Sequence, residues 1–159
     1  MPSKRAPTLL ALLFLAATLV PATALARAWQ GLEPGRTSSE EVVAKLGEPS
    51  GRVKRGAQTV LLYKEEAAPA GTKTAQFHCR GDGVVEEITV FLANPIDAES
   101  IEGEFGKAEK KTFSDDFQKV WQYPRKGVTV YFDKDGTVKA ISYTAAAQAP
   151  RPAADAKAP

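Results

Sequence analysis

The sequence predicts an α+β fold built as a tandem repeat of one helix plus a four-stranded antiparallel sheet, with the helices packed on one sheet face. Two observations predict this fold. A short amphipathic stretch that ends in glycine occurs twice, at Ser38–Gly47 and at Asp97–Gly106. Each copy is followed by segments in which apolar and polar residues alternate, which is the pattern of half-buried strands. Because these features come in the same order in both copies, we expect one structural unit written twice.

The first 28 residues are expected to lie outside this fold. Residues 1–28 begin with basic side chains, continue with the apolar run Thr8–Val20, and end in small residues that suit cleavage after Ala26 or Ala28. This combination is typical of a cleavable secretory signal peptide, and the apolar run is too short for a stable membrane-spanning helix. The sequence therefore predicts an exported protein that is periplasmic or secreted.

The rest of the chain divides into three parts. Residues 29–93 form the first expected helix-plus-sheet repeat, and residues 94–143 form the second. Residues 144–159 are rich in alanine and proline and offer little to a packed core. We expect this last segment to be a disordered tail.

Charge and cysteine content exclude several classes of protein. The full chain has 21 Lys and Arg against 19 Asp and Glu; removal of the signal takes away Lys4, Arg5 and Arg27, which leaves 18 basic and 19 acidic residues and a net charge of −1. A chain with this balance has no electrostatic footprint for nucleic acid. Cys79 is the only cysteine, so no intramolecular disulfide and no lipid-anchoring cysteine after the signal is expected.

The first helix is predicted from its ends. Ser38 and Glu41 have the spacing of a capping box, with Thr37 or Ser39 as alternative caps. Gly47 supplies a left-handed residue after the helix, and Pro49 prevents its continuation. One apolar stripe lies between these signals, formed by Val42, Val43 and Leu46.

The second helix follows the same pattern with different residues. Asp97 is expected to cap it, and Gly106 to end it. Ile101 and Phe105 are four residues apart and therefore face the same side of the helix. This side is expected to pack on the second sheet. Because a single copy of this size would be only marginally stable, we expect either that the two sheets join or that the helices share a core.

The strands and their turns follow from alternation. Inward-facing apolar residues recur at every second position, in the sets Leu61 and Tyr63; Ala75, Phe77 and Cys79; Ile88, Val90 and Leu92; Trp121 and Tyr123; Val128, Val130 and Phe132; Ile141 and Tyr143. Asp-Gly pairs at 82–83 and 135–136 predict hairpin turns. Weaker strands are expected near Arg52–Arg55 and Ala108–Phe113.

The residues that could carry chemistry do not converge. Cys79 falls on the inward face and is expected to be a buried, unreactive thiol. His78 falls on the opposite face, without a second metal ligand or a partner for acid–base catalysis in the sequence pattern. No nucleophile motif, phosphate-binding loop or metal motif is present. We therefore expect no enzyme activity, no catalytic residues, no cofactor and no metal.

The outward face of the strands is less polar than a fully solvated surface. By alternation it carries Val60, Leu62, His78, Val85, Phe91, Val120, Gln122, Thr129, Tyr131 and Val138. Such a face is either scattered surface apolarity or a protein-binding surface with aliphatic and aromatic anchors. For the second interpretation the candidate partner-binding residues are Val60, Leu62, His78, Val120, Gln122 and Tyr131.

The stretch Gly31–Pro49 resembles a helix-opening motif of the BamE (SmpA/OmlA) family, with matching residues Gly35, Thr37, Glu41, Val42, Leu46, Gly47 and Pro49. The tandem architecture is also similar to the beta-lactamase inhibitor protein, which binds its target with a sheet face. The resemblance covers about Gly31–Tyr63. It implies an envelope protein that binds other proteins, without catalytic residues, in outer-membrane protein assembly or envelope integrity.

The functional hypothesis is accordingly a non-enzymatic, exported protein-binding module of the bacterial cell envelope, whose partner is a protein of unknown identity. One alternative is an inhibitor of a secreted or periplasmic hydrolase. An alternative of another class is a small-ligand carrier or an enzyme that uses His78 in a pocket between the two copies. The last alternative requires His78 beside an acidic residue in an enclosed site.

Overall fold

The computed structural model describes residues 26–146. In this range the chain forms two α-helices, eight strands and two short 3₁₀ turns. Their bounds in chain order are α1 Ser39–Leu46, β1 Gly51–Arg55, β2 Gln58–Lys64, a 3₁₀ turn at Glu65–Ala67, β3 Thr72–Cys79, β4 Val85–Leu92, α2 Ala98–Phe105, β5 Lys110–Phe113, β6 Lys119–Tyr123, a 3₁₀ turn at Pro124–Lys126, β7 Val128–Phe132 and β8 Val138–Thr144. Most of the predicted signal peptide 1–28, and the tail beyond residue 146, fall outside this range.

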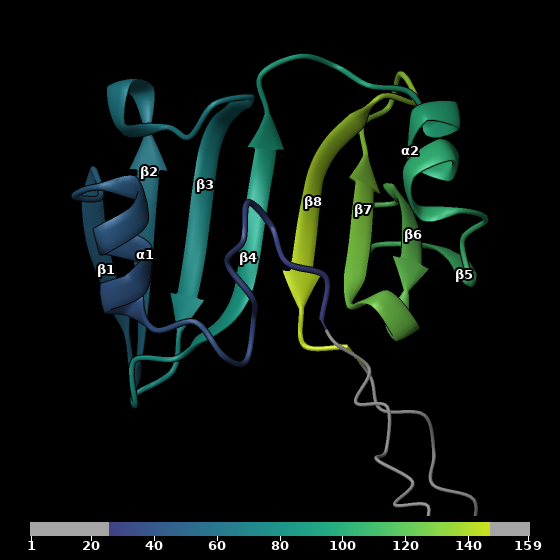
Figure 1. Cartoon of the computed structure of the whole chain (residues 1–159). Coiled ribbons are helices and arrows are strands. Elements are labelled where there is room, and N and C mark those ends of the chain that lie inside the picture. The colour runs from purple at the N-terminus through teal and green to yellow at the C-terminus, as the bar shows by residue number, and fades with distance from the viewer. Residues whose placement is uncertain (1–25, 147–159) are drawn as a thin grey trace, which may run out of the picture.

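All eight strands belong to one antiparallel sheet with the order β1-β2-β3-β4-β8-β7-β6-β5 (Figure 1). The predicted tandem repeat of two four-stranded sheets is therefore wrong. The two last strands, β4 and β8, pair with each other from Glu87 opposite Thr144 to Phe91 opposite Ala140. This pairing gives hydrogen-bond partners to two strand edges that would otherwise be open. One continuous sheet, with its outer edges at β1 and β5, replaces the two predicted sheets.

Helix α1 begins and ends as its local sequence dictates. The Ser38 hydroxyl accepts a hydrogen bond from the Glu41 N–H at 3.2 Å, and the Glu41 carboxylate accepts one from the Ser38 N–H at 2.7 Å. These bonds confirm the predicted capping box and satisfy two N–H groups at the start of the helix. Gly47 follows the helix with φ 84° and ψ −170°, a conformation open almost only to glycine and different from the predicted left-handed helical one.

Helix α2 is capped by one residue instead of a reciprocal pair. The Asp97 carboxylate accepts a hydrogen bond from the Ser100 N–H at 2.8 Å, which confirms Asp97 as the cap. Ile101 and Phe105 are buried, as their spacing predicts. Gly106 ends the helix with φ 79°. Both helices thus end at a glycine whose positive φ turns the chain back toward the sheet.

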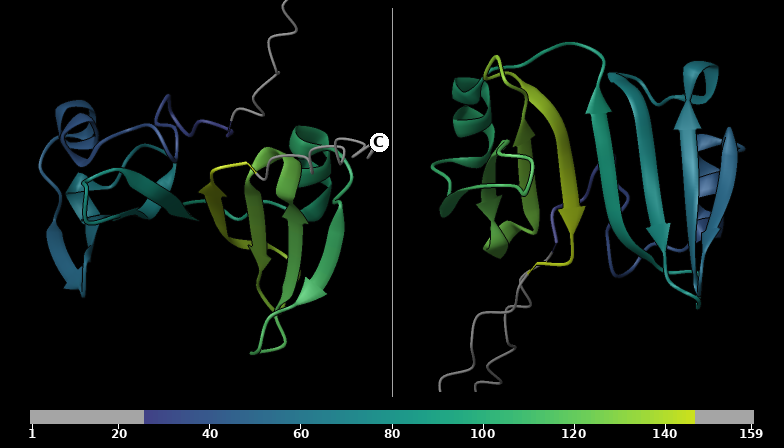
Figure 2. Two further views of the ribbon diagram at one scale, coloured as in Figure 1. Left: turned by 90° about the horizontal axis from the view of Figure 1, so that it is seen from below. Right: turned by 180° about the vertical axis from the view of Figure 1, so that it is seen from behind.

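Both helices lie on the same side of the sheet, and the other side carries no helix (Figures 1 and 2). The segment 26–38 crosses the middle of the sheet on the helix side, held by backbone bonds between Gly35 and Val85 at 2.7 Å and between Val85 and Thr37 at 2.8 Å. The core fills the space between this layer and the sheet. Its largest fully buried side chains are Tyr63, Tyr123, Phe77 and Phe132.

Two bulges change the predicted alternation. His78 pairs with Glu87 while Cys79 pairs with Val85, so β4 has one extra residue at this point. Phe132 likewise pairs with Val138 while Tyr131 pairs with Ala140. A bulge of this kind lets residues on either side of it face the same way. Val85 and Val138, predicted for the outward face, are therefore buried in the core.

Three hairpin turns share one hydrogen-bond pattern. They span Arg80–Val84, Asp133–Thr137 and Ser114–Gln118, and in each the fourth residue donates its N–H to the first residue's carbonyl oxygen. This fourth residue has a positive φ and is Gly83, Gly136 or Phe117. The predicted Asp-Gly turns are thereby confirmed. Phe117 has the positive φ that glycine adopts at the same position of the other two turns. In residues 26–146 no helix is long and apolar enough to cross a membrane.

Candidate functional site

The candidate site is the sheet face that carries no helix, here called the open face. Residues directly opposite each other in the register share a face, so the ladder defines this surface. Its residues include Val53, Val60, Leu62, Thr74, Gln76, His78, Glu87, Thr89, Phe91, Ala140, Ser142, Thr129, Tyr131, Val120, Gln122 and Thr112. The same register places three basic residues on this face, each at the end of a strand: Arg55, Lys64 and Lys110. The middle of the open face is mostly uncharged, and its groove is lined by two charged residues, Glu87 and Lys139.

A groove of about 340 Å³ crosses the centre of the open face, where β4 and β8 join the two halves of the sheet. His78 lines it on one side and Tyr131 on the other, with Phe91 between them and Gln118 near the β5–β6 turn. Its floor is partly polar, because the Thr89 and Ser142 hydroxyls hydrogen-bond across the β4–β8 junction at 2.8 Å. Aromatic rings beside satisfied hydroxyls are a combination found at protein interfaces.

Two valines on the open face are buried although no layer covers them. Val60 is 6% exposed and lies between Val53 and His78 in the register. Val120 is 4% exposed and lies between Thr112 and Tyr131. Their neighbours on the adjacent strands shield them from solvent. The larger neighbours, rather than the valines, therefore form the accessible surface.

All six predicted partner-binding residues lie on the open face. Val60 and His78 are paired on β2 and β3, and Val120 and Tyr131 are paired on β6 and β7. The groove brings His78 and Tyr131 to one site. Leu62 and Gln122 lie on β2 and β6, with β3, β4, β8 and β7 between them, and are not brought together.

Tyr131 is a half-buried aromatic residue of the groove. Burial, with a smaller contribution from the Glu87 carboxylate, raises the pKa of its hydroxyl above the ordinary value of 10.0. The hydroxyl therefore stays protonated at physiological pH and can donate a hydrogen bond. Tyr131 thus offers an apolar ring and a polar tip to anything that binds here.

His78 does stand opposite an acidic residue, Glu87, in the β3–β4 register. Both side chains line a groove that is open along the sheet rather than an enclosed pocket. Within residues 26–146, no group of three or more His, Cys, Asp and Glu side chains is arranged to hold a metal ion. The enclosure that an enzyme site built on His78 requires is missing from this part of the chain.

The strongest apolar exposure was not predicted. Phe117 is 88% exposed and Phe113 69% exposed, and both belong to the β5–β6 hairpin, whose tip borders the groove at Gln118. Aromatic residues in a short segment usually indicate core positions. The acidic pair Asp115 and Asp116 between them is the signal that could have indicated an exposed turn.

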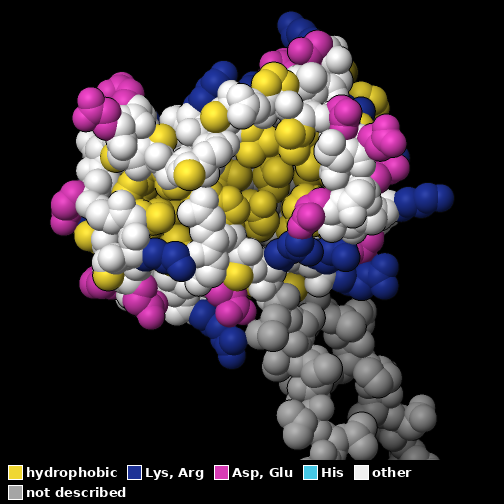
Figure 3. Space-filling view, turned by 45° about the horizontal axis from the view of Figure 1, so that its top comes forward, with side chains coloured by type: hydrophobic (Ala, Val, Ile, Leu, Met, Phe, Trp, Pro, Cys, Tyr) yellow, Lys and Arg dark blue, Asp and Glu magenta, His cyan; other side chains and the backbone are white. Residues whose placement is uncertain are grey.

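The helix side of the sheet has a different character. Apolar side chains gather in a hollow on this side, toward the upper end of the sheet (Figure 3). Partly buried apolar residues that pack on the core include Trp29, Leu92 and Ile96. Cys79 is buried on this side, and burial, with a smaller contribution from Glu40, raises its pKa to about 11. This confirms the predicted buried thiol.

Comparison by sequence identifies no relative: no known protein family and no curated protein matches the chain. Comparison by structure finds proteins of similar fold. A DUF4309 family protein (YjgB) from Bacillus subtilis superposes with a TM-score of 0.55 at 16% identity, covering 73% of this chain and 83% of that one. An extracellular protein containing an SCP domain from Bacillus anthracis superposes with a TM-score of 0.51 at 16% identity, covering 76% of this chain and 46% of that one.

A third structure, a cysteine-rich secretory protein from Staphylococcus aureus, superposes with a TM-score of 0.47 at 9% identity, covering 69% of this chain and 42% of that one. This chain therefore spans less than half the length of the second and third proteins. At these identities the likeness concerns the fold alone. The second is described as extracellular and the third as secretory.

These neighbours correct the predicted resemblance. They are DUF4309 and SCP-domain proteins, and neither the BamE family nor the beta-lactamase inhibitor protein is among them. The motif at Gly31–Pro49 is explained by helix capping and a glycine stop, which physics alone favours. The expected role in outer-membrane protein assembly, which depended on this resemblance, is withdrawn together with it.

Proposed function

We propose that this chain is a non-enzymatic binding protein that holds another protein on the open face of its sheet. The observation that carries the proposal is the mostly uncharged middle of this face, where His78, Phe91 and Tyr131 surround one groove and the basic residues lie at strand ends. A solvated antiparallel sheet face usually alternates to strongly polar side chains. Here uncharged and aromatic residues occupy the centre of the face, where binding anchors are most effective.

The proposed location is outside the cytoplasm, in the bacterial periplasm or in the medium. The basic start, apolar run and small residues of segment 1–28 support export by a cleavable signal. Sequencing the N-terminus of the protein recovered from its native host tests this directly. A mature chain beginning at Arg27 or Trp29 supports export, and an intact Met1 in the cytoplasmic fraction contradicts it.

Site-specific photo-crosslinking in the native host tests the binding face. A benzophenone amino acid at Gln76, in the middle of the open face, is expected to crosslink a discrete protein. The same group at Glu99, exposed on α2, is the matched control and is expected to give no such band. Adding Tyr131→Glu should reduce the Gln76 crosslink by about fivefold or more, because it places an unpaired charge at the centre of the interface.

Equal crosslinking from Gln76 and Glu99 would contradict the proposal. A Gln76 crosslink that Tyr131→Glu leaves unchanged would contradict the part assigned to the groove. The Tyr131→Glu protein is expected to fold, because the Tyr131 ring lies on the open face and outside the core. Circular dichroism and a urea unfolding curve check this.

A further inference from the structure

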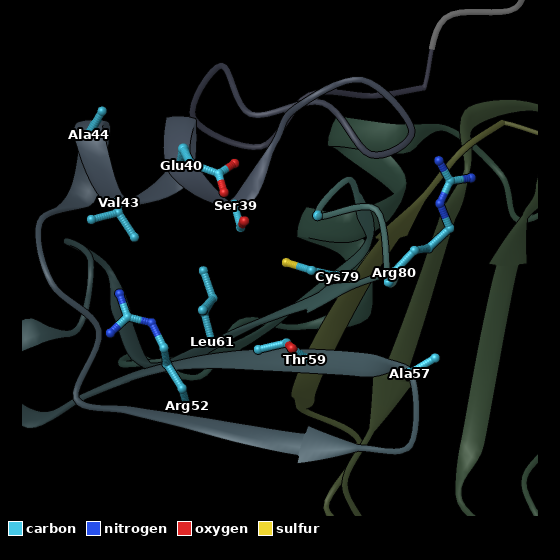
Figure 4. A pocket seen from close by; sticks show the side chains of 12 residues that line it. Ser39, Glu40, Val43, Ala44, Arg52, Ala57, Thr59, Leu61, Cys79 and Arg80 are labelled. Carbon is cyan, nitrogen blue, oxygen red and sulfur yellow. The ribbon is translucent and has the colours of Figure 1, made fainter.

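A second cavity lies on the other side of the sheet, between helix α1 and strands β1 to β3 (Figure 4). It has a volume of about 520 Å³, within the range of small-molecule sites. Val43 reaches into it from the helix, and Leu61 and Cys79 from β2 and β3. Because Leu61 and Cys79 belong to the core, the floor of this cavity is fixed by the packing of the sheet.

The side chains on the floor of this cavity are smaller than their counterparts on the other half of the sheet. Leu61 is opposite Arg52 on β1, and the residue in the same place on the other half of the sheet is Trp121, opposite Lys111 on β5. The counterpart of Cys79 on that half is Phe132, which like Cys79 ends its strand just before a hairpin turn. The Trp121 and Phe132 rings pack at a centroid distance of 4.8 Å beneath α2.

The second half of the sheet therefore shows what fills this space when large rings are available. The Lys111 ammonium group even covers the Trp121 ring at 4.0 Å and binds Glu102 of α2 at 3.3 Å. Under α1 the corresponding side chains leave an opening with an apolar floor. A molecule that binds the folded protein in this opening would stabilise the fold, because it binds the native state and not the unfolded chain.

The charges at the rim select the kind of molecule. The Arg52 guanidinium lines the cavity from β1, and Glu40 lines it from the start of α1 (Figure 4). Arg80 also lines it and binds Asp82 at 2.9 Å. Arg52 donates to Glu48 at 2.9 Å, but both side chains of this pair are at least half exposed. Such an exposed pair is weak, so an incoming anion can displace Glu48.

We propose that this cavity binds a small amphipathic organic anion, such as a medium-chain fatty acid. The apolar part lies over Leu61, Val43 and the neutral thiol of Cys79, and the anionic head binds the Arg52 guanidinium at the β1 rim. The head thereby stays on the β1 side of the cavity, whereas Glu40 comes from the helix. This site is on the opposite side of the sheet from the proposed protein-binding face and stands independently of that function.

Two fluorescent probes with a shared ring system test the site. Anilinonaphthalene sulfonate is an anion, and N-phenylnaphthylamine is its neutral relative. The wild-type protein is expected to bind one equivalent of the sulfonate about five- to tenfold more tightly than the amine, because a charge-assisted contact with Arg52 adds to the apolar burial. Decanoate is expected to displace both probes from the same site.

Arg52→Gln should make the two probe affinities equal, and Lys54→Gln, on the same strand but outside the cavity, should leave the preference unchanged. Leu61→Trp should abolish the binding of both probes by filling the cavity as Trp121 fills its counterpart. If Leu61→Trp does not fold, Arg52→Gln against Lys54→Gln decides the outcome alone. Probe binding that is unchanged by Arg52→Gln, or equally weakened by Lys54→Gln, overturns the proposal.

Discussion

The Tyr63 hydroxyl donates a hydrogen bond to the Gly47 carbonyl oxygen at 2.9 Å and thereby ties the last residues of β2 to the end of α1. The other half of the sheet contains the same link, because the Tyr123 hydroxyl donates to the Gly106 carbonyl oxygen at 3.1 Å. In both cases a buried strand tyrosine satisfies a carbonyl group that the helix end leaves without a partner. Each helix is thus held to the sheet by a polar contact as well as by its apolar stripe.

Replacing Tyr63 by Phe is expected to lower the free energy of unfolding by about 1 kcal/mol, because the Gly47 carbonyl oxygen loses its partner while the ring stays in place. Urea unfolding measures the change. Tyr143→Phe is the matched control, since Tyr143 is buried but makes no side-chain hydrogen bond in residues 26–146. Equal losses for the two variants would contradict a specific role for the helix-end contact.

The backbone conformation of Phe117 is expected to be unfavourable for an aromatic residue. Its φ is 57°, and its ring is 88% exposed, so the fold gains little from the side chain. Phe117→Asn should therefore raise the free energy of unfolding by about 0.5 kcal/mol, because asparagine tolerates positive φ better than an aromatic residue does. Phe113→Asn is the control, since Phe113 is also exposed but lies in strand β5, where asparagine is disfavoured.

A stability gain for Phe117→Asn combined with unchanged partner crosslinking would mean that the ring has no part in binding. A stability gain combined with a loss of crosslinking would place the hairpin tip at the edge of the proposed interface. Strain that persists in a folded protein often accompanies a functional position. An unfolding free energy that falls in Phe117→Asn would show that the backbone at this turn is not strained.

The elements of this fold could be predicted from local patterns because their causes are local. The Ser38–Glu41 box and Asp97 act on N–H groups within three residues, and Gly47 and Gly106 act on the next peptide unit. Alternation likewise identified the inward face of most strands. These signals depend on neighbouring residues in the chain, so a single sequence contains them in full.

The pairing of β4 with β8, which unites the two halves in one sheet, could not be predicted from local patterns. Alternation indicates which side of a strand faces the core, but backbone pairing between β4 and β8 depends on N–H and C=O groups that all residues share. The apolar–polar alternation of the sequence does not indicate the two β-bulges either. Because of these bulges, Val85 and Val138 face the core. The groove between His78 and Tyr131 depends on the β4–β8 pairing. The sequence could therefore predict that both residues lie on the outward face, but not that they line one groove.

The cap of α2 predicts a specific dependence of stability on pH. Hydrogen bonds to its carboxylate, first from the Ser100 N–H, lower the pKa of Asp97 below its ordinary value of 3.8. The folded protein therefore binds this proton less tightly than the unfolded chain does. The resulting stabilisation is present above the ordinary pKa and is lost as the pH falls through the lowered pKa of the folded state.

Asp97→Asn keeps a capping side chain but cannot titrate. We expect the stability advantage of the wild-type protein over Asp97→Asn to be largest near pH 6 and to shrink toward zero near pH 2, as measured by urea unfolding. Asp115→Asn, in the β5–β6 turn, is the control and should show no such convergence. A difference for Asp97→Asn that is constant from pH 6 to pH 2 would rule out the charged cap.

The reactivity of the Cys79 thiol tests how well the core on the helix side of the sheet is closed to solvent. With its pKa raised to about 11 by burial, about one thiol in a thousand is ionised at pH 8, whereas about a quarter is ionised in an unfolded chain. Because the thiolate is the reactive form, Ellman's reagent should react with the native protein at least about 100-fold more slowly than with the protein in urea. Glu40→Gln should speed the native reaction, because the Glu40 carboxylate contributes to the raised pKa. A native thiol that reacts as fast as the unfolded one would place Cys79 outside the core and would remove the floor of the cavity beneath α1.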